Sequence, residues 1–68
     1  SNTTNTHKIR REARLYIEFA RFEARQKEYE RARLIYQYAL GLFTRSQAAG
    51  LYHSYAQFER QHGNAETI

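Results

Sequence analysis

Sixty-eight residues are enough for one small domain or for a segment of a larger protein. The chain has no cysteine, so disulfide bonds cannot stabilise it. Its 41% hydrophobic and 26% charged residues are typical of a globular protein, and no apolar run approaches the roughly 20 residues that a membrane span needs. A formal net charge of +4 permits nucleic acid or an acidic protein surface as a partner and identifies neither.

The first expected helix covers residues 7–26. Residues 1–6 are polar throughout, and we expect a disordered tail or a remnant of recombinant expression there, with Thr6 capping the helix. Apolar side chains then recur at i, i+3, i+4 and i+7, which is typical of an amphipathic helix. Tyr16, Phe19 and Ala20 form the stripe, Glu23 falls at its i+7 position, and Leu15 and Phe22 widen it.

A second helix is expected over residues 28–43, after a break at Lys27-Glu28. The chain has no proline and only three glycines, which favours helix throughout. The apolar stripe of this helix is formed by Tyr29, Ala32, Tyr36, Ala39, Leu40 and Phe43.

A third helix is expected over residues 47–61. Thr44 and Gln47 have the spacing of a capping box, in which two side chains satisfy free N–H groups at a helix start. Gly63 is expected to end this helix as a left-handed C-cap, and Asn64 to cap a further helix that begins in residues 65–68. The apolar residues of the third helix are Leu51, Tyr52, Tyr55, Ala56 and Phe58.

The first and third expected helices share one sequence motif. Residues 15–23 and 51–59 both fit L-Y-x-x-[FY]-A-x-F-E, at an offset of 36 residues from Leu15 to Leu51. Two helices per period of this length are typical of an α-solenoid, in which stacked helix pairs bury each other's apolar flanks. We therefore expect an all-α fold of antiparallel repeats, a segment of a longer array. Residues 7–43 would form the first repeat, and residues 44–68 the first helix and the start of the second helix of the next.

The motif resembles the half-a-tetratricopeptide (HAT) repeat. In this comparison Tyr16 and Tyr52 stand where the family usually has tryptophan. The second helix resembles the family in its run Ala32-Arg33-x-x-Tyr36-x-x-Ala39-Leu40. The resemblance implies that the following residues define the repeat and are structural: Tyr16, Phe19, Ala20, Phe22, Glu23, Ala32, Arg33, Tyr36, Ala39, Leu40, Tyr52, Tyr55, Ala56, Phe58 and Glu59.

Residues 15–64 resemble, more specifically, the middle of crooked neck-like pre-mRNA splicing factors. The resemblance is carried by Phe19–Glu23, by Glu30–Leu40 and by Phe58–Gly63. It implies a nuclear scaffold in the Prp19-associated (NineTeen) complex of the spliceosome, with other spliceosomal proteins as partners.

The aromatic side chains have two readings. They could form a stacking platform for single-stranded RNA. However, Tyr16, Phe19, Tyr36, Tyr52, Tyr55 and Phe58 share the stripe with the alanines, so we expect them to pack in the core. Tyr29 and Tyr38 are the better candidates for aromatic residues that face a partner.

A basic run near the amino terminus is formed by Lys8, Arg10, Arg11 and Arg14. One reading is contact with phosphates or with an acidic partner, driven by charge neutralisation. The other is a solvated helix face on which neighbouring glutamates pair with these cations. Both readings stay open on sequence alone.

Catalytic and metal sites are not indicated. Nothing in the sequence positions a second acid, a nucleophile or a metal beside Glu23 or Glu59, so we expect a structural role, with Arg33 donating to Glu23 across the helix pair. The three histidines lack metal-ligand spacing. We expect a protein that is not an enzyme and that needs no cofactor and no metal.

The leading hypothesis is therefore a non-catalytic scaffold that binds proteins during spliceosome assembly and pre-mRNA splicing. The alternative is an RNA-binding module in RNA processing. In isolation the chain is expected to self-associate, because the outer helices would lack neighbours to stack on.

Overall fold

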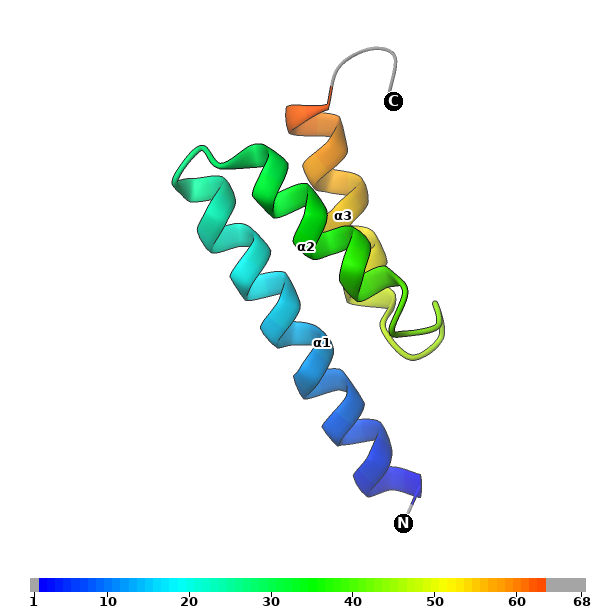
Figure 1. Cartoon of the computed structure of the whole chain (residues 1–68). Helices are drawn as coiled ribbons and strands as arrows, with labels where there is room; N and C mark the ends of the chain where they lie inside the picture. Colours follow the sequence, from blue (N-terminus) through cyan, green and yellow to red (C-terminus); the bar gives the residue numbers. More distant parts are fainter. Residues whose placement is uncertain (1, 64–68) are drawn as a thin grey trace.

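A computed structural model describes residues 2–63 and, within that range, contains three α-helices and no strand. They are α1 (Asn2–Arg25), α2 (Tyr29–Leu40) and α3 (Ala49–His62), which run antiparallel in chain order (Figure 1). The expected all-α class is confirmed. Among the described residues, no helix combines the length and apolarity needed to cross a membrane.

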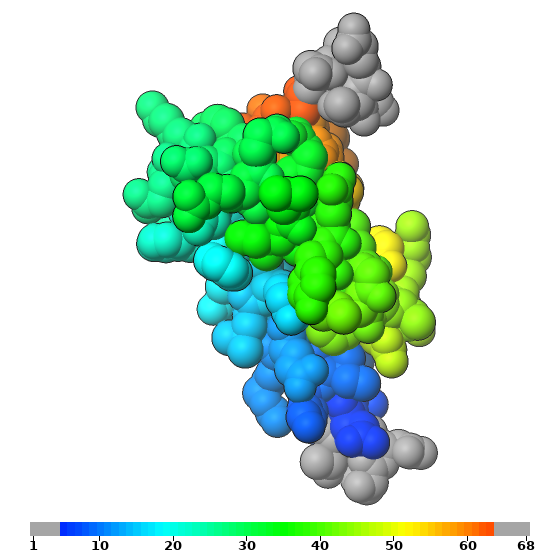
Figure 2. Space-filling model, viewed as in Figure 1, coloured from blue at the N-terminus to red at the C-terminus, as the bar shows by residue number. Residues whose placement is uncertain are grey.

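The first helix begins earlier than expected. Asn2–Thr6 belong to α1, so these residues of the expected tail are helical and Thr6 lies inside the helix instead of capping it. The sequence before Gly41 contains neither proline nor glycine, and each residue added to an existing helix gains a backbone hydrogen bond. As a result the amino-terminal half of α1 projects beyond α2 (Figure 2).

The break between α1 and α2 lies where it was predicted, at Lys27-Glu28. Main-chain hydrogen bonds hold the turn in shape. Lys27 adopts a left-handed conformation with φ 63°. Its N–H donates to the carbonyl of Ala24 at 2.9 Å, and the N–H of Glu28 donates to the carbonyl of Glu23 at 2.9 Å. This pair of bonds is the Schellman motif, formed here without glycine.

The left-handed cap expected at Gly63 is wrong. Gly63 has φ −79° and ψ 159°, which is extended backbone, although its N–H still donates to the carbonyl of Glu59 at 2.8 Å. A single terminal hydrogen bond suffices here, and the chain leaves α3 in an extended direction. The expected cap at Asn64 lies outside the described residues.

The connection between α2 and α3 is longer than expected, because α2 ends at Leu40 and α3 begins at Ala49. The predicted reciprocal bonds form: the N–H of Thr44 donates to Oε1 of Gln47 at 2.9 Å, and the N–H of Gln47 donates to Oγ1 of Thr44 at 3.2 Å. They close a separate turn in this connection instead of capping α3. The connection allows Phe43 to fold back into the core.

The core is built mainly from small side chains. Its buried apolar residues are Ala13, Ala20, Ala32, Tyr36, Ala39, Phe43, Ala48, Leu51 and Phe58, and five of these nine are alanines. Alanine lets helix backbones approach closely, and α1 and α2 form the most extensive contact between the described helices. The predicted close contact through Ala32 and Ala39 is present, since neither has exposed surface.

The apolar stripe of α1 faces the core at a different angle from the one predicted. Leu15, Phe19 and Phe22 are exposed by 64%, 51% and 49%, so the expectation that Phe19 packs in the core is wrong. The buried face instead contains Ala13 and Ala20, with partly buried side chains beside them. The motif carries apolar residues on more than one side of the helix, and α2 covers only one of them.

Replacing Ala32 with leucine should destabilise the fold. Ala32 has no exposed surface, and inserting a larger side chain into a packed contact typically costs about 1–3 kcal/mol. Gln57→Ala, an exposed position on α3, is the control and should leave the melting temperature nearly unchanged. Thermal unfolding monitored by circular dichroism measures both, and equal melting temperatures would contradict the assigned packing.

Candidate interaction surfaces and the contact between repeats

A bidentate ion pair joins α2 to α3. Arg33 of α2 donates from its Nε to Oε2 of Glu59 at 2.8 Å and from a second guanidinium nitrogen to Oε1 at 3.0 Å. The Arg33 side chain is 19% exposed and that of Glu59 15%, so water screens the pair only partly. Arg33 also pairs with Glu30 one turn earlier. This fork-shaped arrangement fixes α3 against α2.

Aromatic and hydroxyl groups surround this ion pair. The guanidinium of Arg33 lies over the ring of Phe58, 5.5 Å from its centroid. The hydroxyls of Tyr36 and Ser54 share a buried hydrogen bond of 2.7 Å, and the Tyr36 ring lies 5.4 Å from Phe58. The interface between repeats therefore combines a charged pair with a satisfied polar pair, which makes its register specific.

Arg33 does not pair with Glu23, so that expectation is wrong. The ion pair of Glu23 among the described residues is with Nε of Arg31, 3.5 Å from its Oε1. Arg33 is two residues further along α2 and therefore points toward α3, where Glu59 occupies the position equivalent to Glu23. The internal repeat places an equivalent glutamate in each copy of the motif, and the direction in which Arg33 leaves α2 selects Glu59.

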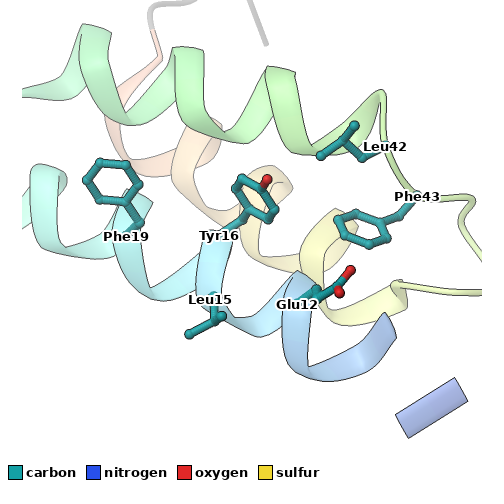
Figure 3. A pocket seen from close by; sticks show the side chains of 6 residues that line it. All are labelled: Glu12, Leu15, Tyr16, Phe19, Leu42 and Phe43. Carbon is teal, nitrogen blue, oxygen red and sulfur yellow. The ribbon is translucent and has the colours of Figure 1, made fainter. Parts of the chain in front are cut away.

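An open apolar groove of about 450 Å³ lies where α1 passes the end of α2. Figure 3 shows Tyr16, Phe19, Leu42 and Phe43 around it, whereas Leu15 points away from α2. Its polar contribution is the carboxylate of Glu12, and Leu15 completes the lining. Sequence reasoning did not identify this groove, since it treated most of these side chains as core.

The exposed aromatic residue of α2 is Tyr38, with 62% of its surface accessible, as predicted. Its ring lies 5.9 Å from that of Tyr16, at the border of the groove. Leu34, one turn earlier, is 65% exposed and was not identified from the sequence. Tyr29 is half-buried instead, because its ring stacks on His62 at 4.2 Å.

The basic run lies on the half of α1 that projects beyond α2 (Figures 1 and 2). Lys8, Arg10, Arg11 and Arg14 are all exposed. None of the ion pairs found among the described residues involves them. The structure therefore brings four cations together on one helical segment without pairing them to the neighbouring glutamates.

The repeated motif occupies two different environments. Ala20 is fully buried under α2, whereas its equivalent Ala56 is exposed on α3. Ala56 lines an open groove of about 610 Å³ together with Tyr52 and Tyr55, both of which are half-buried instead of fully buried. The described residues contain no group of three or more histidines or carboxylates that could hold a metal ion.

The 36-residue helical period and the ion pair that joins successive units define the chain as a segment of an α-helical repeat protein. Over 51 residues it is 53% identical to pre-mRNA-splicing factor cwf4 of Schizosaccharomyces pombe, and over 55 residues 51% identical to pre-mRNA-splicing factor clf1 of Aspergillus fumigatus. It is 45% identical over 57 residues to protein crooked neck of Drosophila melanogaster. The chain corresponds to a region of the crooked neck-like pre-mRNA splicing factors.

These matches cover 75%, 81% and 84% of the chain, respectively, but the chain spans only about 8% of the length of each of these curated relatives. No family model matches the chain, and no solved structure matches it at a significant level. The similarity thus concerns one small region of much longer proteins.

Arg33 and Glu59 should be energetically coupled. A double-mutant cycle with Arg33→Met and Glu59→Gln should give an interaction energy of roughly 1–3 kcal/mol, because the pair is bidentate and mostly shielded from water. The matched control is a cycle of Arg33→Met with Glu23→Gln, which should give an energy near zero. Equal coupling in both cycles, measured by urea unfolding, would contradict the contact between repeats.

Stability should also depend on pH through Glu59. The hydrogen bonds from Arg33 hold the pKa of the Glu59 carboxyl below its ordinary value of 4.5. The contribution of the pair is therefore complete above that value and is lost as the pH falls through the lowered pKa of the folded state. Glu59→Gln should reduce the acid-induced loss of unfolding free energy below pH 4.5, and an unchanged pH profile would speak against the pair.

Proposed function

We propose that this chain is a non-catalytic, HAT-type scaffold segment that binds other proteins during spliceosome assembly, in the nucleus and within the Prp19-associated complex. The observation that carries the proposal is the exposed apolar surface of α1, of α2 and of the connection that follows α2. Its large side chains are exposed by 48% to 65%, and they are Leu15, Phe19, Phe22, Leu34, Tyr38 and Leu42. Exposed patches of this kind mark protein interaction sites in soluble proteins. The names of the relatives direct the proposal to splicing.

The two motif glutamates support a structural role. Glu59 is held by Arg33 in two hydrogen bonds, and Glu23 is buried with Arg31 beside it. A general acid or base needs access to a substrate and a proton to transfer. Carboxylates fixed by arginines within helix contacts supply packing and register instead.

The test uses the longer splicing factor that, on this proposal, contains the chain. Tyr38→Ser combined with Leu42→Ser should reduce its association with spliceosomal proteins and reduce splicing in a depleted extract by several-fold, while leaving the melting temperature of the 68-residue chain nearly unchanged. Both side chains are about half exposed or more, so their loss should spare the core. Gln57→Ala is the matched surface control. Full splicing activity of the double variant would overturn the assignment of this surface.

RNA binding is the second candidate, and the unpaired basic run of α1 is the observation that favours it. Contact with phosphates would make the affinity for unstructured RNA fall with salt, by a slope of about −0.7 per phosphate neutralised on a single strand. Replacing Arg10 and Arg11 with glutamine would then lower that slope. Partner binding through Tyr38 and Leu42 should respond little to salt, because the contact is apolar.

The isolated chain should self-associate. α1 and α3 each leave an apolar side uncovered, and such surfaces bring copies together as the concentration rises. Phe22→Ser should weaken the association, since that side chain is 49% exposed and lies outside the core. Sedimentation velocity over a concentration series measures it. A single monomeric species at every concentration would contradict this expectation.

A further inference from the structure

A hollow of about 280 Å³ lies between α1 and the start of α3, and it shares no residue with the groove in Figure 3. Its wall on α1 is formed by residues at the spacing i, i+3, i+4 and i+7, which are Arg10, Ala13, Arg14 and Ile17. Residues 46–51, which include the end of the connection after α2, form the other wall. The hollow therefore joins one face of α1 to this connection.

Small residues hold α1 close to the start of α3 in this region. Ala13 of α1 and Ala48, directly before α3, are exposed by only 4% and 5%. A Cβ atom added to Gly50 would lie 4.0 Å from Cδ1 of Ile17, which is ordinary van der Waals contact. Close packing of this kind fixes where the polar side chains of the two walls lie relative to each other.

Two arginines make the hollow positively charged. Arg10 and Arg14 are one turn apart and exposed, and none of the ion pairs found among the described residues involves them. No carboxylate lines the hollow in the part of the chain that the structure describes. Glu12 and Glu18 line a separate hollow of α1, to which Arg14 also contributes. An anion between the two walls would therefore meet two guanidinium groups.

Ser46 supplies the hydroxyl group of the opposite wall. It is exposed and lies in the connection between α2 and α3, outside any helix. Its hydroxyl shares a hydrogen bond of 3.2 Å with that of Thr44, which is also exposed. An exposed connection can enter the cleft of a modifying enzyme while the helices stay packed. Ser46 is therefore accessible to a protein kinase.

We propose that Ser46 is a phosphorylation site whose phosphoryl group is held by Arg10 and Arg14 of α1. The kinase transfers the γ-phosphoryl group of ATP to Oγ of Ser46. The Oγ–P bond forms, the bond between the γ-phosphorus and the bridging oxygen breaks, and ADP leaves while the hydroxyl proton goes to the base of the kinase. The product carries about −1.5 to −2 charges at pH 7 and three acceptor oxygens, to which both guanidinium groups can donate.

The modification would change the surface of α1 in two ways. It would fasten the part of α1 that projects beyond α2 to the connection before α3. It would also neutralise Arg10 and Arg14, which leaves Lys8 and Arg11 as the free cations of the basic run. Phosphorylation would therefore lower the attraction of this segment for an anionic partner. The contact between the phosphate and the arginines does not depend on the scaffold function proposed above.

The test uses the 68-residue chain made by chemical synthesis with phosphoserine at position 46. Phosphorus NMR over a pH series measures the second pKa of the phosphate, which is about 6 without neighbouring charges. The reference is a phosphopeptide of residues 42–50, which contains Arg45 but neither Arg10 nor Arg14. Nearby cations favour the dianion, so this pKa should be lower in the chain by about half a pH unit or more, a threefold change in the dissociation constant.

Arg10→Gln combined with Arg14→Gln should return the pKa of the phosphate to that of the peptide. Lys8→Gln combined with Arg11→Gln removes two charges from the same helix outside the hollow, and this control should keep most of the difference. Phosphorylation should also raise the melting temperature by about 4 °C or more in the chain and in the control, and not in the first variant. All four side chains are exposed, so both variants should fold.

A pKa that falls equally in both double variants, or that equals the peptide value in the unaltered chain, would overturn the contact. Mass spectrometry of the longer splicing factor, isolated with phosphatase inhibitors, tests the modification itself and rests on the proposed function. Recovery of the peptide around Ser46 only in its unmodified form would overturn the assignment. These results leave the splicing test of Tyr38 and Leu42 unaffected, so the phosphorylation site and the scaffold function can fail separately.

Discussion

α1 and α2 meet across alanine side chains, and the rest of the structure depends on that close approach. Ala20, Ala32 and Ala39 are fully buried in the core that the helices share. Because these residues end at Cβ, the backbones come near enough for Tyr36 to reach Ser54 of α3 behind them. A wider separation would move Arg33 with its helix, and the ion pair with Glu59 tolerates little displacement.

The repeated motif allows two copies of the same sequence pattern to be compared within one chain. α3 shows how the motif is packed when a helix lies on the side of Leu51 and Phe58, and α1 shows how it is packed when a helix lies on the side of Ala20. Neither copy has both neighbours among the described residues. The comparison identifies side chains that are exposed in one copy and buried in the other, so that their exposure depends on the neighbouring helices. It cannot be made for Tyr38, which has no described counterpart in a second copy.

Periodicity predicted the number, order and direction of the helices, since the spacing of apolar residues and the absence of proline are local properties. It did not predict which side of each helix is covered. Phe19 and Ala56 match the motif as well as any other position, yet they are exposed, because burial depends on which neighbouring helix is present. The predicted pairing of Arg33 with Glu23 was wrong for a related reason. The direction in which a side chain points depends on the rotation of its helix about its axis, and the motif alone does not determine that rotation.

The corner between α1 and α2 has a consequence for how such a chain can change over time. Its shape is held by main-chain hydrogen bonds to the carbonyls of Glu23 and Ala24 and by the left-handed conformation of Lys27. Main-chain bonds require no particular side chain, so Gln26 and Glu28, which are exposed, are free to vary in charge and size, whereas the left-handed conformation of Lys27 disfavours β-branched side chains at that position. The surface of this corner can therefore change in charge and size to suit a new partner, while the angle between α1 and α2 stays the same.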